Sequence, residues 1–240
     1  MAIDIQVTWA ETGRRERREI KFVFDRAAAG RLVAWLSGRC LSDPEFPEGI
    51  VSSIYYDTRN WTLLEEKTNS DYLKTKIRVR WYADIETGEP GEASFLEVKR
   101  KEGGLSRKTR IPFALSGRWL ANAALNDSEL LVVRHHLRGH AAVPAEPIFP
   151  AFVVRYKRVR FVEPITGARL CVDWDIGSPR VNAQLLPAVQ SFVFPFGVFE
   201  AKGDIEELPP VLHAMTALGC RKEAVSKYLA CYRHILRRDF

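Results

Sequence analysis

The sequence has only four cysteines in 240 residues, and no two of them show the C-x-x-C spacing of a zinc ribbon or a dithiol redox site. We therefore expect reduced, buried or incidental thiols, as in a cytosolic protein. No apolar run approaches the roughly 18 residues that a membrane-spanning helix needs. Residues 1–18 also lack the apolar core of a secretory signal, so the predicted location is cytoplasmic.

Histidine is scarce, with five residues in the chain. Three of them, His135, His136 and His140, lie close together, and the last two would share one face of a helix. No acidic residue or cysteine stands at metal-ligand spacing from them, so we interpret the group as a solvated helix end. The sequence also shows no Ser-His-Asp or Cys-His arrangement at catalytic spacing, which argues against a side-chain nucleophile.

The chain does have enough apolar residues to form a core, because 46% of its residues are hydrophobic and six are tryptophans. Its 36 basic and 30 acidic residues give a net charge of +6. This balance favours anionic partners, but it is too low for a dedicated nucleic-acid-binding protein, so no specific nucleic acid is expected. An alternation of charged and apolar side chains runs along the chain and continues unchanged past the proline-rich residues 144–150. We therefore predict a single domain, residues 1–240, with its core in residues 15–236.

That pattern is clearest in residues 76–82, where charged and apolar side chains alternate. In a strand, Arg78 and Arg80 would share one face, with Ile77 and Val79 on the other. Basic and acidic residues mix on one face of further segments in the same way: Glu19 with Lys21, Glu97 with Lys99 and Lys101, Lys108 with Arg110, Arg158 with Arg160, Arg169 with Asp173, and Glu200 with Lys202.

Two arginines that share a strand face lie about 7 Å apart. Their repulsion is on the order of 2 kcal/mol at an effective dielectric constant of about 20. Solvent and salt would screen this repulsion on an open surface, whereas several such strands around one enclosure would need a polyanion to neutralise them. The pattern by itself leaves open whether the charged face lies outside in water or inside around a ligand.

The order of the expected elements indicates an α+β protein with an antiparallel sheet. Asp25 and Asn60 are expected to cap the first two helices. The number of charged strand faces suits a barrel wide enough to hold a ligand. We expect strands in residues 15–24, 51–57, 76–82, 94–101, 106–113, 152–163, 168–176 and 192–202, and helices in residues 27–36, 61–67, 118–138, 208–218 and 224–238.

Nine short motifs occur in one order along nearly the whole chain. Any one of them is weak, but together they resemble the VTC domain, the polyphosphate polymerase branch of the CYTH-like triphosphate tunnel metalloenzymes. The motifs are Glu19-x-Lys21-Phe22, Tyr55-Tyr56-Asp57, Ile77-Arg78-Val79-Arg80-Trp81-Tyr82, Phe95-Leu96-Glu97-Val98-Lys99, Lys108-x-Arg110, Tyr156-x-Arg158-x-x-Phe161, Arg169-x-x-x-Asp173, Phe199-Glu200-Ala201-Lys202 and Ser226-Lys227-Tyr228.

The resemblance implies a closed antiparallel β-barrel of about eight strands with flanking helices, whose charged inner face forms a tunnel. It implies Mn²⁺ or Mg²⁺ at Glu200, with Glu19 and Glu97 as further candidate ligands that could equally orient the basic residues. The implied catalytic and phosphate-binding residues are Lys21, Arg78, Arg80, Lys99, Lys108, Arg158, Arg169 and Lys227, and Arg110 and Lys202 are added as substrate-binding residues. Lys101, Arg110 and Arg160 face inward by strand parity and are assigned, as less central candidates, to a tunnel mouth.

The function that the resemblance implies is a metal-dependent transfer of the γ-phosphoryl group of ATP to a growing polyphosphate chain. Two alternatives stay open: a triphosphatase or tripolyphosphatase in the same tunnel, and a non-catalytic module that binds polyphosphate or RNA. The hydrolytic branches of the superfamily begin with E-x-E-x-K, and here the first of these positions is Arg17, which favours the polymerase. We also expect Asp173 to pair with Arg169, and Lys227 to reach the tunnel from its helix.

Overall fold

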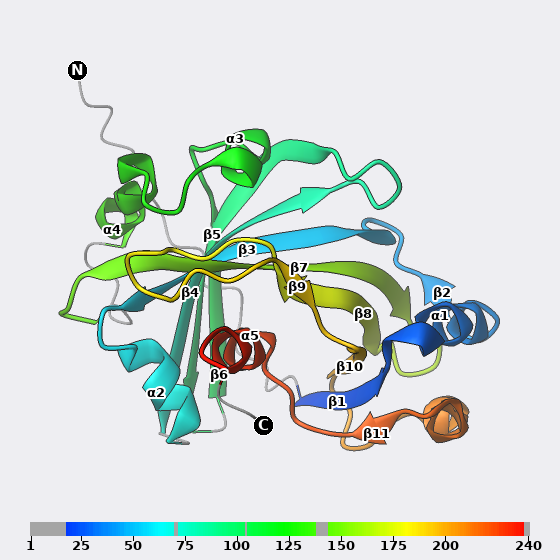
Figure 1. The fold of residues 1–240 in the computed structure, drawn as a ribbon. Helices are drawn as coiled ribbons and strands as arrows, with labels where there is room; N and C mark the ends of the chain where they lie inside the picture. Colours follow the sequence, from blue (N-terminus) through cyan, green and yellow to red (C-terminus); the bar gives the residue numbers. More distant parts are fainter. Residues whose placement is uncertain (1–17, 70–71, 104, 138–143, 238–240) are drawn as a thin grey trace.

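The computed structural model describes residues 18–69, 72–103, 105–137 and 144–237. Eleven strands form one sheet in which every pairing is antiparallel (Figure 1). The strands are β1 (Arg18–Asp25), β2 (Leu41–Ser42), β3 (Glu48–Thr58), β4 (Leu73–Ala83), β5 (Pro90–Glu102), β6 (Leu105–Pro112), β7 (Ile148–Val162), β8 (Arg169–Ser178), β9 (Phe192–Val193), β10 (Phe196–Gly203) and β11 (Arg221–Lys222).

The sheet is not the closed eight-stranded barrel that was predicted. Its strand order is β11-β1-β10-β8-β7-β3-β4-β5-β6, with β2 on β7 and β9 on β8, and no ladder joins β6 to β11 within the described residues. All eight expected strands are present, but the one expected in residues 192–202 is divided into β9 and β10. The additional strands β2 and β11 have two residues each, too few to show an alternating pattern. Side chains rather than backbone bridge the two halves of the curve: Lys99 on β5 lies 3.8 Å from Glu19 on β1.

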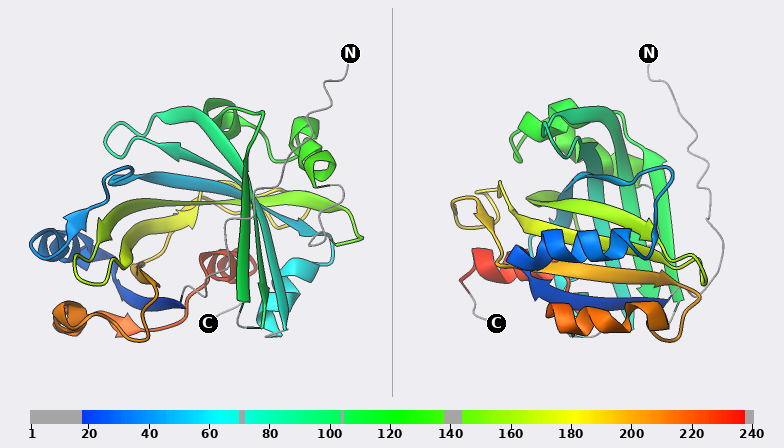
Figure 2. Two further views of the ribbon diagram at one scale, coloured as in Figure 1. Left: turned by 180° about the vertical axis from the view of Figure 1, so that it is seen from behind. Right: turned by 90° about the vertical axis from the view of Figure 1, so that its right-hand side faces the viewer.

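The helices divide between the two faces of the curved sheet. α1 (Ala29–Ser37), α3 (Gly117–Asn122) and α4 (Val133–His136) lie outside the curve, whereas α5 (Lys227–Ile235) lies within it (Figures 1 and 2). We call the face toward α5 the inner face. Two apolar clusters cover the outer face, and a third, which includes Tyr228 and Cys231 of α5, packs on the inner face. The remaining helical elements are α2 (Thr62–Thr68) and the 3-10 segments η1 (Arg26–Ala28), η2 (Ser128–Val132) and η3 (Pro210–Leu218).

The predicted alternation in β4 is confirmed by its packing. Ile77 and Val79 are buried in the outer cluster that also receives Leu120 of α3 and Leu130 of η2. Their neighbours Arg78 and Arg80 therefore point to the inner face. The same parity applies in β10, where Phe199 and Ala201 are in an outer cluster and Glu200 lies between them. The question that the pattern left open is thus answered: the charged side chains face inward.

Helix boundaries differ from the expectations in several places. Asp25 does cap the first helical segment, because its carboxylate accepts a hydrogen bond from the backbone nitrogen of Ala27. The expected cap by Asn60 is wrong, since α2 begins after Trp61 and its first nitrogens donate to Thr58 Oγ1 and Asp57 Oδ1 instead. These two acceptors end β3, so the strand itself caps the next helix. Residues 118–138 break into α3, η2 and α4, and residues 210–218 form a 3-10 segment.

Further expectations concern the cysteines, the histidines and membrane-spanning helices. The four cysteines are free and buried. His136 Nδ1 lies 3.1 Å from the carbonyl oxygen of Val132, whereas His140 and residues 15–17 lie outside the described residues. Within the described part of the chain, no helix combines the length and the hydropathy needed to cross a bilayer.

Candidate active site

Charged side chains from seven strands and from the first residue of α5 meet on the inner face. Most of them come from strand positions next to a residue of an outer apolar cluster, so local alternation places them there. We call this set the charged face. It consists of nine basic residues, Lys21, Arg78, Arg80, Lys99, Lys108, Arg110, Arg158, Lys202 and Lys227, and four acidic residues, Glu19, Glu97, Asp173 and Glu200.

Glu97 on β5 is the centre of one half of the charged face. Its Oε2 lies 2.7 Å from Arg78 Nη2 and 3.5 Å from Arg80 Nη1, and its Oε1 lies 2.6 Å from Lys108 Nζ and 3.8 Å from Arg110 Nε. Burial alone would raise the pKa of Glu97, but the charges of Arg80, Arg78 and Lys108 hold the pKa well below its usual range. We call these five residues the Glu97 cluster. The carboxylate is 1% exposed and contacts four cations from two strands, β4 and β6.

Glu200 on β10 is the centre of the other half. Its Oε1 accepts from Lys227 Nζ at 3.0 Å and from Lys21 Nζ at 3.3 Å. Its Oε2 accepts from Lys202 Nζ and lies 3.7 Å from Arg158 Nη2. Burial would raise the pKa of Glu200, but the surrounding cations, Lys202 foremost, hold it well below the ordinary value. We call this group the Glu200 cluster.

Asp173 joins the Glu200 cluster through a different partner from the one expected. Arg158 binds it with two hydrogen bonds, Nε to Oδ1 at 2.6 Å and Nη2 to Oδ2 at 2.7 Å, and Lys227 Nζ lies 2.6 Å from Oδ2. The expected pairing with Arg169 is wrong, because Arg158 stands directly across the β7–β8 ladder. Arg169 is four residues away on the same strand, about 13 Å at the usual rise per residue. It is exposed at the start of β8.

Glu19 on β1 connects the two halves. It lies 3.1 Å from Lys202 Nζ, 3.6 Å from Lys21 Nζ and 3.8 Å from Lys99 Nζ. Lys99 is two residues from Glu97 on the same face of β5, so Glu19 lies between the Glu97 cluster and the Glu200 cluster. Lys101, which was assigned to a tunnel mouth, is exposed, and Arg160 donates from Nη1 to the carbonyl oxygen of Phe46.

The charged face is therefore not a wall of unpaired cations. Each of its four carboxylates touches two or more basic side chains, which removes most of the mutual repulsion that the sequence suggested. The nine basic and four acidic side chains still leave an excess of five positive charges among the described residues. An enclosed excess of this size suits a ligand that carries several negative charges along its length.

Sequence reasoning overlooked several neutral side chains that orient the cations. Arg78 Nη1 donates to Tyr55 Oη at 2.9 Å, and Arg80 Nε donates to Ser53 Oγ at 3.1 Å. Tyr156 accepts from Arg80 through its hydroxyl, and its ring lies 5.1 Å from both Arg158 Cζ and Lys227 Nζ. Tyr156 shares its strand face with Arg158, so its parity was the available signal, whereas Tyr55 meets Arg78 only across the β3–β4 ladder.

The acidic residues fit a divalent cation only in one way. Among the described residues, no group of three or more His, Cys, Asp or Glu side chains could hold a metal ion by itself. Mg²⁺, however, usually binds through one or two carboxylates together with substrate phosphates. Glu19 and Glu200 are diagonal neighbours across the β1–β10 ladder and share Lys21 and Lys202 as partners. This pair fits an ion that arrives with phosphate oxygens, whereas Glu97, surrounded by cations, fits a role in orienting them.

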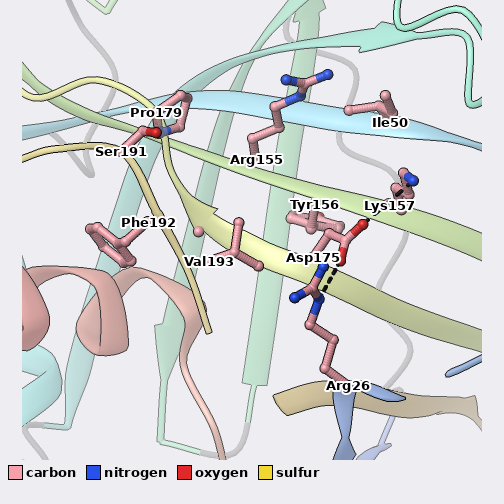
Figure 3. A pocket seen from close by; sticks show the side chains of 11 residues that line it. Arg26, Ile50, Arg155, Tyr156, Lys157, Asp175, Pro179, Ser191, Phe192 and Val193 are labelled. Atoms are coloured by element: carbon pink, nitrogen blue, oxygen red, sulfur yellow. Dashed lines mark hydrogen bonds and ion pairs between the residues drawn. The ribbon is translucent and has the colours of Figure 1, made fainter. Parts of the chain in front are cut away.

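A separate pocket of about 300 Å³ adjoins the charged face (Figure 3). It lies where the β7–β8 register shifts between Arg155 and Lys157 and where Asp175 takes a left-handed backbone conformation (φ 52°). Asp175 accepts from Arg26 Nε at 2.6 Å and lies 3.4 Å from Lys157 Nζ. Tyr156 lines this pocket and also contacts Arg158 and Lys227 of the charged face through its ring.

Comparison with known proteins gives one family and a set of distant structural neighbours. A model of the VTC domain matches residues 16–236. A candidate adenylate cyclase from Bacillus halodurans has a TM-score of 0.51 at 14% identity, over 88% of this chain and 96% of that one, and at this identity the likeness concerns the fold alone. A candidate adenylyl cyclase from Hippeastrum, described as having a dominant triphosphatase activity, has a TM-score of 0.49 at 14% identity, over 90% and 95%. No curated protein sequence matches the chain.

Proposed function

Because the chain belongs to the VTC domain family, we propose that it is a metal-dependent polyphosphate polymerase that transfers the γ-phosphoryl group of ATP to a growing polyphosphate chain. The observation that carries the proposal is the charged face, with its excess of five positive charges. Its two clusters are joined through Glu19 and Lys99 into one continuous surface. Such a surface is suited to two phosphate-bearing substrates held end to end, a donor and an acceptor.

The basic residues would bind the phosphate oxygens. The guanidinium groups of Arg78, Arg80 and Arg158 are held by Glu97 and Asp173, so they present fixed donors. A fixed guanidinium fork matches phosphate oxygens in pairs, whereas lysine acts as a mobile point charge. We therefore assign the arginines to positioning of the phosphate chain. We assign Lys21 and Lys227 to stabilising the negative charge that develops on the phosphate oxygens during transfer.

Glu200, with Glu19 beside it, would hold Mn²⁺ or Mg²⁺ together with phosphate oxygens. When bound, such an ion polarises the phosphoryl oxygens and neutralises their charge. Lys21 and Lys227, which contact Glu200 in the present structure, would then be free to donate to the phosphates.

In the transfer step, an oxygen of the acceptor's terminal phosphate attacks the γ-phosphorus of ATP. A new P–O–P bond forms, the bond between the γ-phosphorus and the β–γ bridging oxygen breaks, and ADP leaves. Terminal phosphate oxygens are already ionised near neutral pH, so the step needs no side-chain nucleophile. The protein contributes alignment and electrostatic stabilisation, the usual means of catalysing phosphoryl transfer.

One sequence feature supports transfer over hydrolysis. The first carboxylate of the E-x-E-x-K pattern of the hydrolytic branches is replaced by Arg17. The chain therefore has one acidic side chain fewer with which to hold a second ion or to activate water near Glu19.

The proposal is tested by incubating the full chain with ATP and Mn²⁺, resolving the products on a gel for long polyphosphate, and measuring free phosphate in parallel. We expect polyphosphate and ADP. Phosphate release without polymer would make the protein a triphosphatase, and salt-sensitive polyphosphate binding without turnover would make it a binding module. Fractionation of cells would test the cytoplasmic location, and limited proteolysis would test the single domain of residues 1–240; both remain predictions.

A further inference from the structure

One end of the charged face carries aromatic rings beside an arginine. There the guanidinium carbon of Arg110, on β6, lies 3.7 Å from the ring centroid of Phe95 and 5.7 Å from that of Tyr82. The two rings meet edge to face, with centroids 6.4 Å apart. Resting on the proposed function, we propose that Arg110, held over the ring of Phe95, is the surface on which the base of the nucleoside triphosphate donor stacks.

The arginine is oriented before any ligand arrives. Its guanidinium carbon lies over the ring of Phe95, and Glu97 Oε1 lies 3.8 Å from its Nε. The Arg110 side chain nevertheless remains 38% exposed. A planar cation fixed on one side and open to solvent on the other can receive a flat ring, as arginine does when nucleobases stack on it.

The position of Arg110 relative to the other cations fits a nucleotide better than an additional phosphate. Arg110 is the member of the Glu97 cluster that contacts Phe95 and Tyr82, and it shares Glu97 with Arg78, Arg80 and Lys108. A base on Arg110 would therefore have its own phosphates beside these three cations. The γ-phosphate would continue along β5 toward Lys99 and Glu19, which lead to Glu200.

A stacking surface has a definite specificity. Every base has a π-face, so stacking distinguishes a nucleotide from inorganic phosphate but hardly distinguishes one purine from another. The inference thus requires ATP and GTP to bind with similar affinity. It also requires ATP to gain from Arg110 and Phe95 an interaction that inorganic tripolyphosphate cannot make.

Calorimetric titration of the full chain with ATP and with inorganic tripolyphosphate, each with Mg²⁺ at constant salt, tests this. Arg110→Lys keeps the charge and removes the planar surface, and Phe95→Leu keeps an apolar side chain and removes the ring. We expect Arg110→Lys to raise the dissociation constant for ATP about tenfold, or about 1.4 kcal/mol. Phe95→Leu should raise it by several-fold, and tripolyphosphate should change less than twofold in either variant.

Arg118→Lys serves as the matched control, because Arg118 is 69% exposed and pairs only with the exposed Glu92 among the described residues. Retained tripolyphosphate binding shows that each variant is folded. Equal weakening of both ligands would make Arg110 a phosphate contact, and no change in either would make it a surface residue; both results overturn the inference. These titrations measure binding without turnover. They therefore test the stacking inference independently of the polyphosphate assay, which tests the proposed function.

Discussion

The hydroxyl of Tyr228, in the first turn of α5, donates a hydrogen bond to Asp57 Oδ2 at the end of β3, with an O–O distance of 2.6 Å. The other oxygen of Asp57 accepts from the backbone nitrogens of Thr58 and Leu63. The ring of Tyr228 stacks on Tyr55 and on Phe152, with centroids 4.5 and 5.1 Å away. Two of the quoted motifs thus meet here. Tyr228 follows Lys227, so this contact holds the start of α5 against the charged face.

Asp57→Asn should remove one component of the pH dependence of stability. Burial raises the pKa of Asp57 to about 6 even though Tyr228 and three backbone nitrogens donate to it. Between about pH 4 and 6, the folded protein therefore keeps a proton on Asp57 that the unfolded chain has already released. Its free energy of unfolding falls across this window as pH rises, by on the order of 2–3 kcal/mol.

Urea unfolding of wild type and Asp57→Asn from pH 4 to pH 7 would measure the difference. The exposed Asp204→Asn is the control. The same slope in wild type and Asp57→Asn would show that Asp57 ionises freely in the fold.

Glu97→Gln should destabilise the ligand-free protein. Arg80 is only 6% exposed, and with the carboxylate gone it and three neighbouring cations would face one another without an anion. Breaking a buried ion pair costs about 3–5 kcal/mol. Tripolyphosphate should restore much of this loss, because it binds only the folded state and supplies the missing charge.

Thermal unfolding with and without tripolyphosphate measures both effects. Glu102→Gln is the control, since Glu102 is 55% exposed. If the melting temperature of Glu97→Gln stays at the wild-type value, the cluster does not depend on its carboxylate.

Glu200→Gln should abolish Mn²⁺-dependent turnover while tripolyphosphate binding stays within a few-fold of wild type. The substitution removes the carboxylate proposed to hold the metal, but it leaves the arginines of the Glu97 cluster unchanged. Product formation across a Mn²⁺ titration, compared with Glu92→Gln on the exposed part of β5, is the measurement. A near wild-type rate at saturating Mn²⁺ would move the metal to Glu19 or Glu97.

Lys227→Ala should lower the transfer rate by about tenfold or more, the scale of one charge-assisted hydrogen bond worth about 1.5–3 kcal/mol. It should also lower stability by a similar amount, because the side chain is 10% exposed and bonds to both Asp173 and Glu200. Burial would lower the pKa of Lys227, but Asp173 and Glu200 raise it, so the lysine stays charged.

Single-turnover kinetics and denaturant unfolding would measure these two effects. Lys222→Ala, on the exposed strand β11, is the control. Unaltered kinetics would make Lys227 a structural ion-pair partner only.

Much of this protein follows from local rules that a sequence contains. Side chains two residues apart share a strand face, so the grouping of Arg78 with Arg80, and of Glu200 with Lys202, could be read without a structure. The positions of the eight longer strands along the chain were predictable for the same reason. The two-residue strands β2 and β11 were not, because so short a segment has no period to detect.

Tertiary structure decided which charges meet. Glu97, on β5, binds cations from both neighbouring strands, β4 and β6. No sequence period relates these strands, so the sequence did not show that their cations share one carboxylate. Asp173 binds Arg158 rather than Arg169 because ladder register, set by the turn between β7 and β8, brings residues far apart in the chain within hydrogen-bond distance. The sequence pattern also could not show whether the two ends of the sheet pair, and no ladder joins β6 to β11 within the described residues. Alternation places a side chain on a face, but only register and curvature determine what lies opposite it.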